Sequence, residues 1–215
     1  MIEHVYTRAT DVAGVSAVIV ATDDNRIVEA VTRFGGIARM TQSTHRTGLE
    51  RVAEVAAGLN CDIVVNVQGD EPLLEPRMVT EAVGALQADT AVQMSTLRKQ
   101  ISDPADAHNP HVVKVTVDQH GNALCFSRAA VPSTHDATLA TFRHIGLYAY
   151  RRKFACELAA LPRTPLEITE SLEQLRALEH GFRVRVVETY YDSIGVDTPE
   201  DLERVRRRMT IEARA

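Results

Sequence analysis

The sequence predicts an α/β fold in which a mostly parallel sheet is flanked by helices and carries an antiparallel hairpin insertion. Helix-type and strand-type segments alternate with short links over the first third of the chain, which requires crossover connections between parallel strands. Near the middle, two strand-type segments flank a short loop that contains glycine, a pattern typical of a hairpin. The chain has 215 residues, 45% of them apolar and 25% charged, so its size and composition are those of an ordinary globular domain.

Capping residues and apolar spacing set the expected elements of the first third. Apolar residues recur at helical spacing from Ile2 onward. Asp24 can cap a second helix, and Thr47 with Glu50 three residues later forms a capping box for a third. The expected order is helix 2–13, strand 17–21, helix 24–34, strand 37–40, helix 47–58 and strand 63–68.

The rest of the chain continues with a helix and a strand before the pattern changes. Residues 118–122 form the glycine-containing loop of the predicted hairpin, so residues 109–150 are expected to include an antiparallel insertion. No linker or repeat interrupts the sequence, which predicts a single domain over residues 1–215. The expected elements are helix 76–87, strands 91–97, 112–117, 123–127 and 142–151, helix 167–179, strand 183–188 and a last helix from Pro199.

Composition excludes several classes of partner. The formal net charge is -5, so the overall field repels a nucleic-acid backbone or an anionic membrane. No apolar run has the length of a membrane span, and the first residues lack the pattern of a secretory signal. The odd number of widely spaced cysteines is typical of a reduced protein. We therefore expect a cytoplasmic protein that binds neither nucleic acid nor a membrane.

Two aspartates stand at positions suited to a divalent cation. Asp70 follows a buried strand at its carboxyl end, where open α/β sheets bind ligands, although a residue that only ends a turn fits the same pattern. Asp197 precedes a helix whose start is explained by Thr198 and Asp201 alone, so it is surplus to the local structure. Two such carboxylates, completed by substrate phosphates, suit Mg²⁺.

Two further segments have both a structural and a functional interpretation. The pair of Thr47 and Glu50 is sufficient as a helix cap, yet Arg51 at a helix N-terminus also suits an anion or a base edge. In the strand 142–151, His144 and Tyr148 share one face with Tyr150. Such a polar face favours a binding site over a core.

Six short motifs follow one another along the chain. They are QGDEP (68–72), NP (109–110) followed by VKV (113–115), FSRA (126–129), RHIGLY (143–148), LEQLR (172–176) and GVDTPEDLE (195–203). Taken in order, they closely resemble those of 3-deoxy-manno-octulosonate (Kdo) cytidylyltransferases, and the resemblance covers essentially the whole chain. It implies a nucleotide-diphospho-sugar-transferase-like α/β fold and a homodimer whose contact includes the hairpin. It further implies transfer of CMP from CTP to the acidic sugar Kdo for lipopolysaccharide biosynthesis, with release of pyrophosphate and use of Mg²⁺.

The resemblance also implies roles for individual residues. Asp70 and Asp197 match catalytic metal ligands, and Arg128 with His144 is expected to meet the carboxylate of the sugar. The expected cytidine-side contacts are Thr47, Arg51 and Gln68. The expected sugar-acid pocket consists of Arg128, His144, Tyr148, Glu173 and Gln174.

The sequence departs from the family pattern in two ways. Leu49 stands where the family usually has Thr or Ser. The first residues match the helix that follows the family's N-terminal strand and phosphate-binding loop, so a unit of roughly 30 residues is expected to be missing. Two alternatives therefore accompany the main hypothesis: a cytidylyltransferase for another acid sugar, such as 8-amino-Kdo or an acylneuraminate, and a truncated non-catalytic homologue that dimerises or binds.

Overall fold

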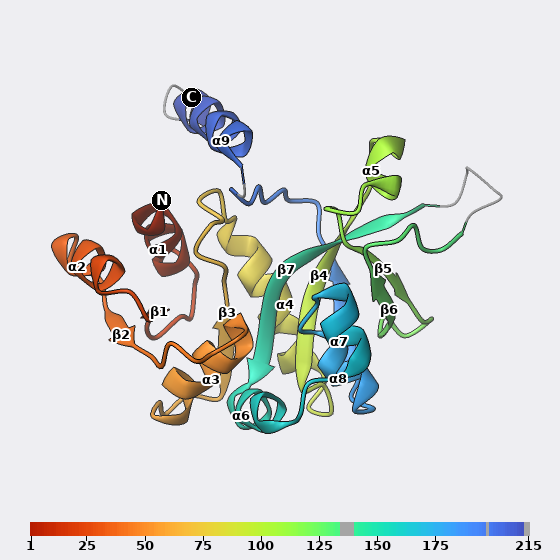
Figure 1. The fold of residues 1–215 in the computed structure, drawn as a ribbon, viewed down its shortest axis with the longest axis horizontal. Helices are drawn as coiled ribbons and strands as arrows, with labels where there is room; N and C mark the ends of the chain where they lie inside the picture. Colours follow the sequence, from red (N-terminus) through yellow and green to blue (C-terminus); the bar gives the residue numbers. More distant parts are fainter. Residues whose placement is uncertain (134–139, 197, 213–215) are drawn as a thin grey trace.

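A computed structural model describes residues 1–133, 140–196 and 198–212 of the chain. Helices and strands alternate in the order that the sequence predicts for most of its length (Figure 1). The N-terminal half comprises α1 (Ile2–Thr10), β1 (Val20–Thr22), α2 (Asn25–Arg33), β2 (Ala38–Met40), α3 (Gly48–Ala57), β3 (Ile63–Asn66), α4 (Pro76–Ala88), β4 (Met94–Gln100) and α5 (Pro104–His108). The C-terminal half comprises β5 (Lys114–Val117), β6 (Ala123–Ser127), β7 (Phe142–Arg151), α6 (Arg152–Ala160), α7 (Pro165–Glu170), α8 (Leu175–Glu179), β8 (Val184–Glu188) and α9 (Pro199–Glu212).

The long strand β7 organises a six-stranded sheet. Along one edge it pairs with β4 over its whole length, from Phe142 opposite Gln100 to Tyr150 opposite Met94. Its other edge is therefore shared by β5 near the start of the strand and by β3 near its end. The hairpin strand β6 extends the sheet beyond β5, and β8 extends it beyond β4.

The α/β class with helices flanking a central sheet is confirmed, and the strand pairing corrects the expectation of a mostly parallel sheet. Four of the six described strands, β3, β4, β5 and β8, point the same way. Because the oppositely directed β7 lies between β4 on one side and β3 with β5 on the other, most neighbouring pairs are antiparallel. The parallel strands β1 and β2 form a separate two-stranded sheet.

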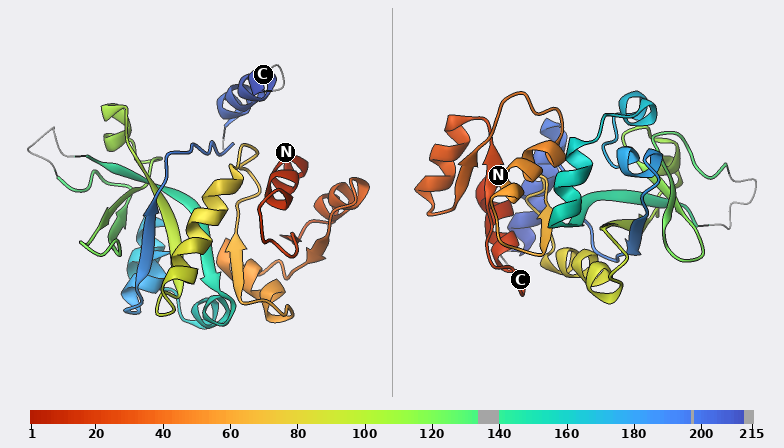
Figure 2. Two further views of the ribbon diagram at one scale, coloured as in Figure 1. Left: turned by 180° about the vertical axis from the view of Figure 1, so that it is seen from behind. Right: turned by 90° about the horizontal axis from the view of Figure 1, so that it is seen from below.

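A hydrophobic core lies on each face of the large sheet. On one face, α4 packs Met78 and Leu86 against Leu97 of β4 and Leu147 of β7. On the other, α6 and α8 pack against Tyr148, Tyr150 and the strands beside them. Figure 2 shows α4 on one side of the sheet, with α1, α2 and the small sheet at one end of the molecule and the hairpin β5–β6 at the other. The site described below lies on the α6–α8 side.

Local signals explain where several helices begin and end. Asp24 caps α2 by accepting a hydrogen bond from the Arg26 nitrogen at 2.8 Å. The Thr47 side chain caps α3 by accepting from the Glu50 nitrogen at 3.3 Å. The single helix expected over residues 167–179 is wrong, because Ser171 adopts a left-handed conformation (φ 54°) that ends α7 before α8 begins. Helices α5 and α6 were not predicted.

The predicted hairpin is confirmed. β5 and β6 pair antiparallel, and Gly121 takes the positive φ of 77° that the connecting loop requires. Within the described part of the chain, no helix combines the length and apolar character needed to cross a membrane.

Candidate active site

A cavity of about 660 Å³ opens beside the carboxyl end of β3 and the middle of β7. Its wall comes from the start of α3, the turn after β3, the loop before β5, the end of β6, β7 and the segment 163–174. This volume is within the range of cavities that hold cofactors and metabolites. The cavity therefore collects residues that lie up to about 130 positions apart in the sequence.

Arginines give the cavity wall its positive charge. Arg46, Arg128, Arg143 and Arg163 all line it. The Arg128 guanidinium is fixed by two backbone carbonyls, donating from Nε to Glu170 O at 2.9 Å and from Nη1 to Pro110 O at 3.1 Å. A guanidinium that is held in place loses little freedom when it binds a carboxylate or phosphate. The wall is suited to an anionic ligand.

A buried lysine fixes the backbone that carries Arg128. Lys114 is fully buried, and its ammonium group donates hydrogen bonds to Asn109 O at 2.9 Å, Val112 O at 2.6 Å and Arg128 O at 2.5 Å. Three carbonyl acceptors satisfy all three ammonium protons, while burial lowers the pKa of the group. Lys114 thus ties the loop before β5 to the end of β6 at the cavity edge.

Glu173 lies against the N-terminus of α3, where the backbone N–H groups favour a negative charge. Its Oε2 accepts from the Leu49 nitrogen at 3.0 Å, and Thr47 donates a second hydrogen bond to the carboxylate. The second oxygen, Oε1, is buried without a hydrogen-bond partner. Burial raises the pKa of Glu173 despite these donors. Glu173 lines the cavity and so brings a buried carboxylate to its wall.

Two tyrosines and a glutamine extend this buried polar group. Tyr148 donates from its hydroxyl to Gln174 Oε1 at 3.0 Å. The Gln174 Nε2 and Tyr150 Oη atoms have no partner among the described residues. Burial raises the pKa of both tyrosines well above 10, so both hydroxyls keep their protons near neutral pH. Unpaired buried donors of this kind are typical of sites that a ligand hydroxyl or water completes.

His144 is a neutral residue in the cavity wall. Its ring contacts Phe126 edge-on at a centroid distance of 5.0 Å and lies 5.4 Å from the ring of Tyr148. Burial lowers the pKa of His144 from 6.5 to about 3. At neutral pH the imidazole can therefore contribute a hydrogen bond to a ligand but no positive charge.

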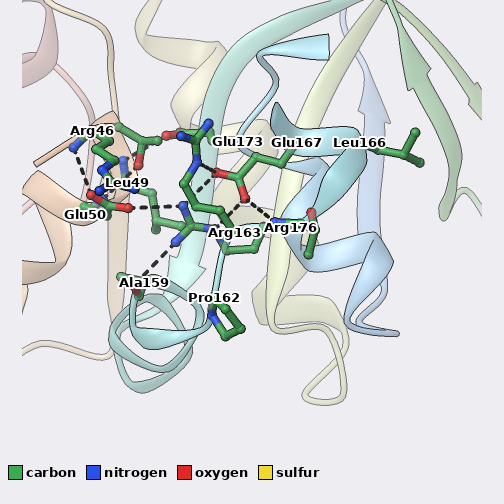
Figure 3. Close-up of polar contacts among 12 residues, drawn as sticks. Arg46, Leu49, Glu50, Ala159, Pro162, Arg163, Leu166, Glu167, Glu173 and Arg176 are labelled. Atoms are coloured by element: carbon green, nitrogen blue, oxygen red, sulfur yellow. Dashed lines mark hydrogen bonds and ion pairs between the residues drawn. The ribbon is translucent and has the colours of Figure 1, made fainter. Parts of the chain in front are cut away.

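An ion-pair network joins α3, α7 and α8 (Figure 3), and its members Arg163 and Glu167 line the cavity. Arg176 is fully buried and donates to both oxygens of Glu167, from Nη2 to Oε1 at 2.7 Å and from Nε to Oε2 at 2.8 Å. Its Nη2 also reaches Glu50 Oε1 of α3 at 3.2 Å. Arg163 adds a contact from the cavity wall to Glu167 Oε1 at 3.1 Å. The network holds the segment that carries Glu173 against the start of α3.

Seven of the ten residues predicted for the site line this one cavity. They come from both the nucleotide-side and the sugar-side predictions, and they are Thr47, Gln68, Arg128, His144, Tyr148, Glu173 and Gln174. Arg51 is not part of the lining, because its guanidinium binds Thr41 Oγ1 at 2.6 Å and Asp23 Oδ2 at 3.0 Å.

The predicted pair of metal ligands is only partly described. Asp70 follows β3, and its carbonyl oxygen accepts from the Val196 nitrogen at 2.9 Å. Beside it, Ser193 donates its hydroxyl proton to Glu71 Oε2. These two contacts hold the segment before α9 against the turn after β3. Asp197 lies outside the described residues.

Leu49, the departure from the family pattern, is a core residue. Its side chain is 1% exposed and belongs to the core on the α6–α8 face. Only its backbone nitrogen takes part in the site, through Glu173. That contact does not involve the leucine side chain.

Sequence reasoning missed five ionisable cavity residues: Arg46, His111, Arg143, Arg163 and Glu167. Arg46 precedes the predicted site residue Thr47, Arg143 begins the motif RHIGLY, and His111 lies between NP and VKV, so nearness to the motifs was an available signal. Arg163 and Glu167 lie outside the motifs and reach the cavity through the path of the chain. Among the described residues, no cluster of three or more metal-ligating side chains is present.

A helix-flanked sheet with an arginine-lined cavity at a strand end is typical of proteins that bind small anionic ligands. The family model described as cytidylyltransferase matches residues 1–189. The chain belongs to the cytidylyltransferase family, and within it to the 3-deoxy-manno-octulosonate cytidylyltransferases. The relative of that name from Geobacter metallireducens is 50% identical over 98% of this chain and 87% of its own length. The one from Geotalea uraniireducens is 51% identical over 97% of this chain and 88% of its own length.

Solved structures agree with this assignment. A CMP:2-keto-3-deoxy-manno-octonic acid synthetase complexed with CTP superposes with a TM-score of 0.93 at 43% identity, covering 98% of this chain and 88% of that chain. A 4-diphosphocytidyl-2C-methyl-D-erythritol synthase from Anaerococcus prevotii has a TM-score of 0.61 at 17% identity, covering 97% and 88%. The second likeness shows the shared fold alone.

Proposed function

We propose that this chain transfers CMP from CTP to the acidic sugar Kdo and releases pyrophosphate. The observation that carries the proposal is the single cavity that holds residues of both predicted half-sites, Thr47 and Gln68 on the nucleotide side and Arg128, Tyr148 and Gln174 on the sugar side. The names of relatives about 50% identical along nearly the whole chain support the same reaction.

The residues of the cavity suit the reacting molecules. The fixed guanidinium of Arg128 can pair with the sugar carboxylate, and the orphaned Glu173 Oε1 and Gln174 Nε2 can bind sugar hydroxyls. In the reaction, a sugar hydroxyl loses its proton to solvent and its oxygen bonds to the α-phosphorus of CTP, while the bond between that phosphorus and the bridging oxygen breaks and pyrophosphate leaves. Catalysis of such a transfer depends mainly on position and charge.

The proposal includes Mg²⁺ held by Asp70 and Asp197. Carboxylate oxygens are the hard ligands that Mg²⁺ prefers, and two contacts fix the segment before residue 197 against the turn of Asp70. Asp70 and Asp197 would hold the ion, which would supply charge neutralisation at the α-phosphate and would acidify the attacking hydroxyl. The chain's own part is to offer the Asp70 carboxylate at the turn after β3, to which Val196 is hydrogen-bonded.

Pyrophosphate release tests the proposal. The protein is assayed with CTP and Mg²⁺ against Kdo, 8-amino-Kdo and an acylneuraminate, and we expect Kdo to give the highest kcat/KM. Asp70→Asn should lower turnover about a hundredfold or more, the scale of a lost electrostatic contact to the transition state. Asp103→Asn, which alters the cap of α5 outside the cavity, is the matched control and should keep normal turnover.

Either of two results would contradict the proposal. A folded Asp70→Asn variant with near-normal turnover would remove the metal role. A wild-type protein that folds but neither binds CTP with Mg²⁺ nor releases pyrophosphate would favour the non-catalytic alternative.

We also propose that the protein is a cytoplasmic homodimer whose contact includes residues 109–150. Leu124 in the hairpin strand β6 is an apolar side chain that is 65% exposed, as expected where a second copy covers it. The three cysteines carry free thiols, which suits a reducing compartment. Sedimentation velocity of the wild type and of Leu124→Lys tests the dimer, and the variant should shift toward the monomer.

A further inference from the structure

Thr96 is the residue of β4 at which the pairing with β7 becomes irregular. It is fully buried and pairs with Tyr148, whereas the next residue, Leu97, pairs with Ile145. Gly146 and the residue after it therefore have no partner on β4, which makes this a bulge of β7. Bulges interrupt the ladder and re-aim nearby side chains, and this one lies between His144 and Tyr148, which both line the cavity.

The Thr96 hydroxyl replaces part of the interrupted ladder. Its Oγ1 lies 2.8 Å from Leu147 O, 3.1 Å from Ile145 O and 2.9 Å from His144 Nε2. A hydroxyl has one proton, and the two carbonyl oxygens can only accept. If that proton went to His144, the Thr96 oxygen would face both carbonyls with no proton between them. The arrangement that forms the most hydrogen bonds has Thr96 direct its proton toward the carbonyl oxygens and accept a hydrogen bond from His144 Nε2–H.

We infer that Thr96 is a positioning residue that holds His144 as the neutral Nε2–H tautomer and leaves Nδ1 as a hydrogen-bond acceptor for the substrate. Burial, which lowers the pKa of His144 to about 3, agrees with one proton on the ring at neutral pH. Nδ1 has no hydrogen-bond partner among the residues that the structure describes. The part of the inference that concerns the substrate rests on the proposed function, whereas the tautomer does not.

An acceptor nitrogen selects the chemistry of the group that meets it. Nδ1 of this tautomer accepts a hydrogen bond from a hydroxyl or amine and repels the lone pairs of a carboxylate. His144 therefore binds a hydroxyl of the acid sugar, and the carboxylate is left to an arginine such as Arg128. This division of roles differs from the expectation that both residues meet the carboxylate.

The tautomer is tested without substrate or turnover. Long-range ¹H–¹⁵N spectra of the uniformly ¹⁵N-labelled full chain distinguish a protonated from an unprotonated ring nitrogen, and a His144→Gln variant identifies the signals among the eight histidines. We expect a protonated Nε2 and an unprotonated Nδ1 throughout pH 6 to 8. A proton on Nδ1, or a doubly protonated ring in this range, would overturn the inference.

Variants of Thr96 test the positioning role. Thr96→Val removes the hydroxyl, and we expect a mixture of His144 tautomers with a KM for the acid sugar about tenfold higher, the scale of one hydrogen bond, at an unchanged KM for CTP. Thr96→Ser keeps the hydroxyl and should restore both the spectrum and the KM. Ser95→Ala is the matched control, because this buried neighbour donates its hydroxyl to Ala82 O at 2.6 Å on the opposite face.

The outcomes separate the inference from the proposed function. If Thr96→Val showed the same His144 tautomer as the wild type and an unchanged KM for the acid sugar, the positioning role of Thr96 would be overturned. If Thr96→Val does not fold, the wild-type and Thr96→Ser spectra still decide, because a proton on Nδ1 in either contradicts the inference. If the wild type shows the expected tautomer but no pyrophosphate release, the proposed function fails while the tautomer assignment stands.

Discussion

Replacing Arg176 with methionine should lower the free energy of unfolding by about 3–5 kcal/mol, the usual cost of removing one partner of a buried ion pair. The structure explains the size of the effect. Glu167 is 1% exposed and receives two hydrogen bonds from Arg176, at 2.7 and 2.8 Å. Without the guanidinium, this carboxylate keeps only Arg163 Nε at 3.1 Å and the Thr164 nitrogen at 3.3 Å.

Urea unfolding followed by circular dichroism measures the loss, since the chain has no tryptophan to report by fluorescence. The double variant Arg176→Met/Glu167→Gln also removes the buried negative charge of Glu167, which Arg176→Met leaves without its main partner. The double variant should therefore be more stable than Arg176→Met alone. The change in the free energy of unfolding of the double variant, minus the sum of the changes in Arg176→Met and Glu167→Gln, gives the coupling energy of the pair. A loss below about 1 kcal/mol in Arg176→Met, or strict additivity in the cycle, would refute the reasoning.

The same variant should respond to pH in a defined direction. Burial alone would raise the pKa of Glu167, but hydrogen bonds from Arg176 and Arg163 hold it below its usual value of 4.5. The stability from this pair is therefore present above pH 4.5 and is lost as the pH falls through the lower pKa of the folded state. The difference in stability between wild type and Arg176→Met should accordingly narrow below pH 4.5.

Two further predictions concern residues of the cavity wall. The pKa of His144 falls from 6.5 to about 3 on folding, so the unfolded chain takes up the proton first as the pH is lowered. Between pH 6.5 and 3, the free energy of unfolding of the wild type should therefore fall by up to about 1.4 kcal/mol per pH unit more than that of His144→Gln. Parallel curves of urea-derived stability against pH for the two proteins would contradict this. Leu49→Thr should lower the free energy of unfolding by about 2–4 kcal/mol, while the KM for CTP stays within about twofold of the wild-type value. A greatly raised KM for CTP at unchanged stability would instead assign the Leu49 side chain to the site.

The sequence determined the features that depend on residues a few positions apart. The caps of Asp24 on α2, of Thr47 on α3 and of Thr198 with Asp201 on α9 were all predictable and are present. The hairpin with Gly121 and the whole of β7 were predictable for the same reason. Local hydrogen bonds and alternation of apolar side chains fix such elements before distant parts of the chain meet.

The motifs also led to most of the cavity. Seven predicted residues meet there, because residues that bind one ligand occupy the short segments that the motifs mark. The motifs give no distance between segments, however. They could not show that Arg51 turns toward Asp23, or that Leu49 is a core side chain.

Only the tertiary structure decided the pairing of the sheet and the protonation of the site. β7 has two edges, and which strands occupy them follows from packing on both faces, so a sequence that alternates helix and strand still forms mostly antiparallel neighbours. The neutral state of His144 arises from burial against Phe126 and Tyr148, and its hydrogen bond to Thr96 crosses 48 positions of the chain. These properties depend on contacts between distant segments, and local sequence patterns do not specify which distant segments come into contact.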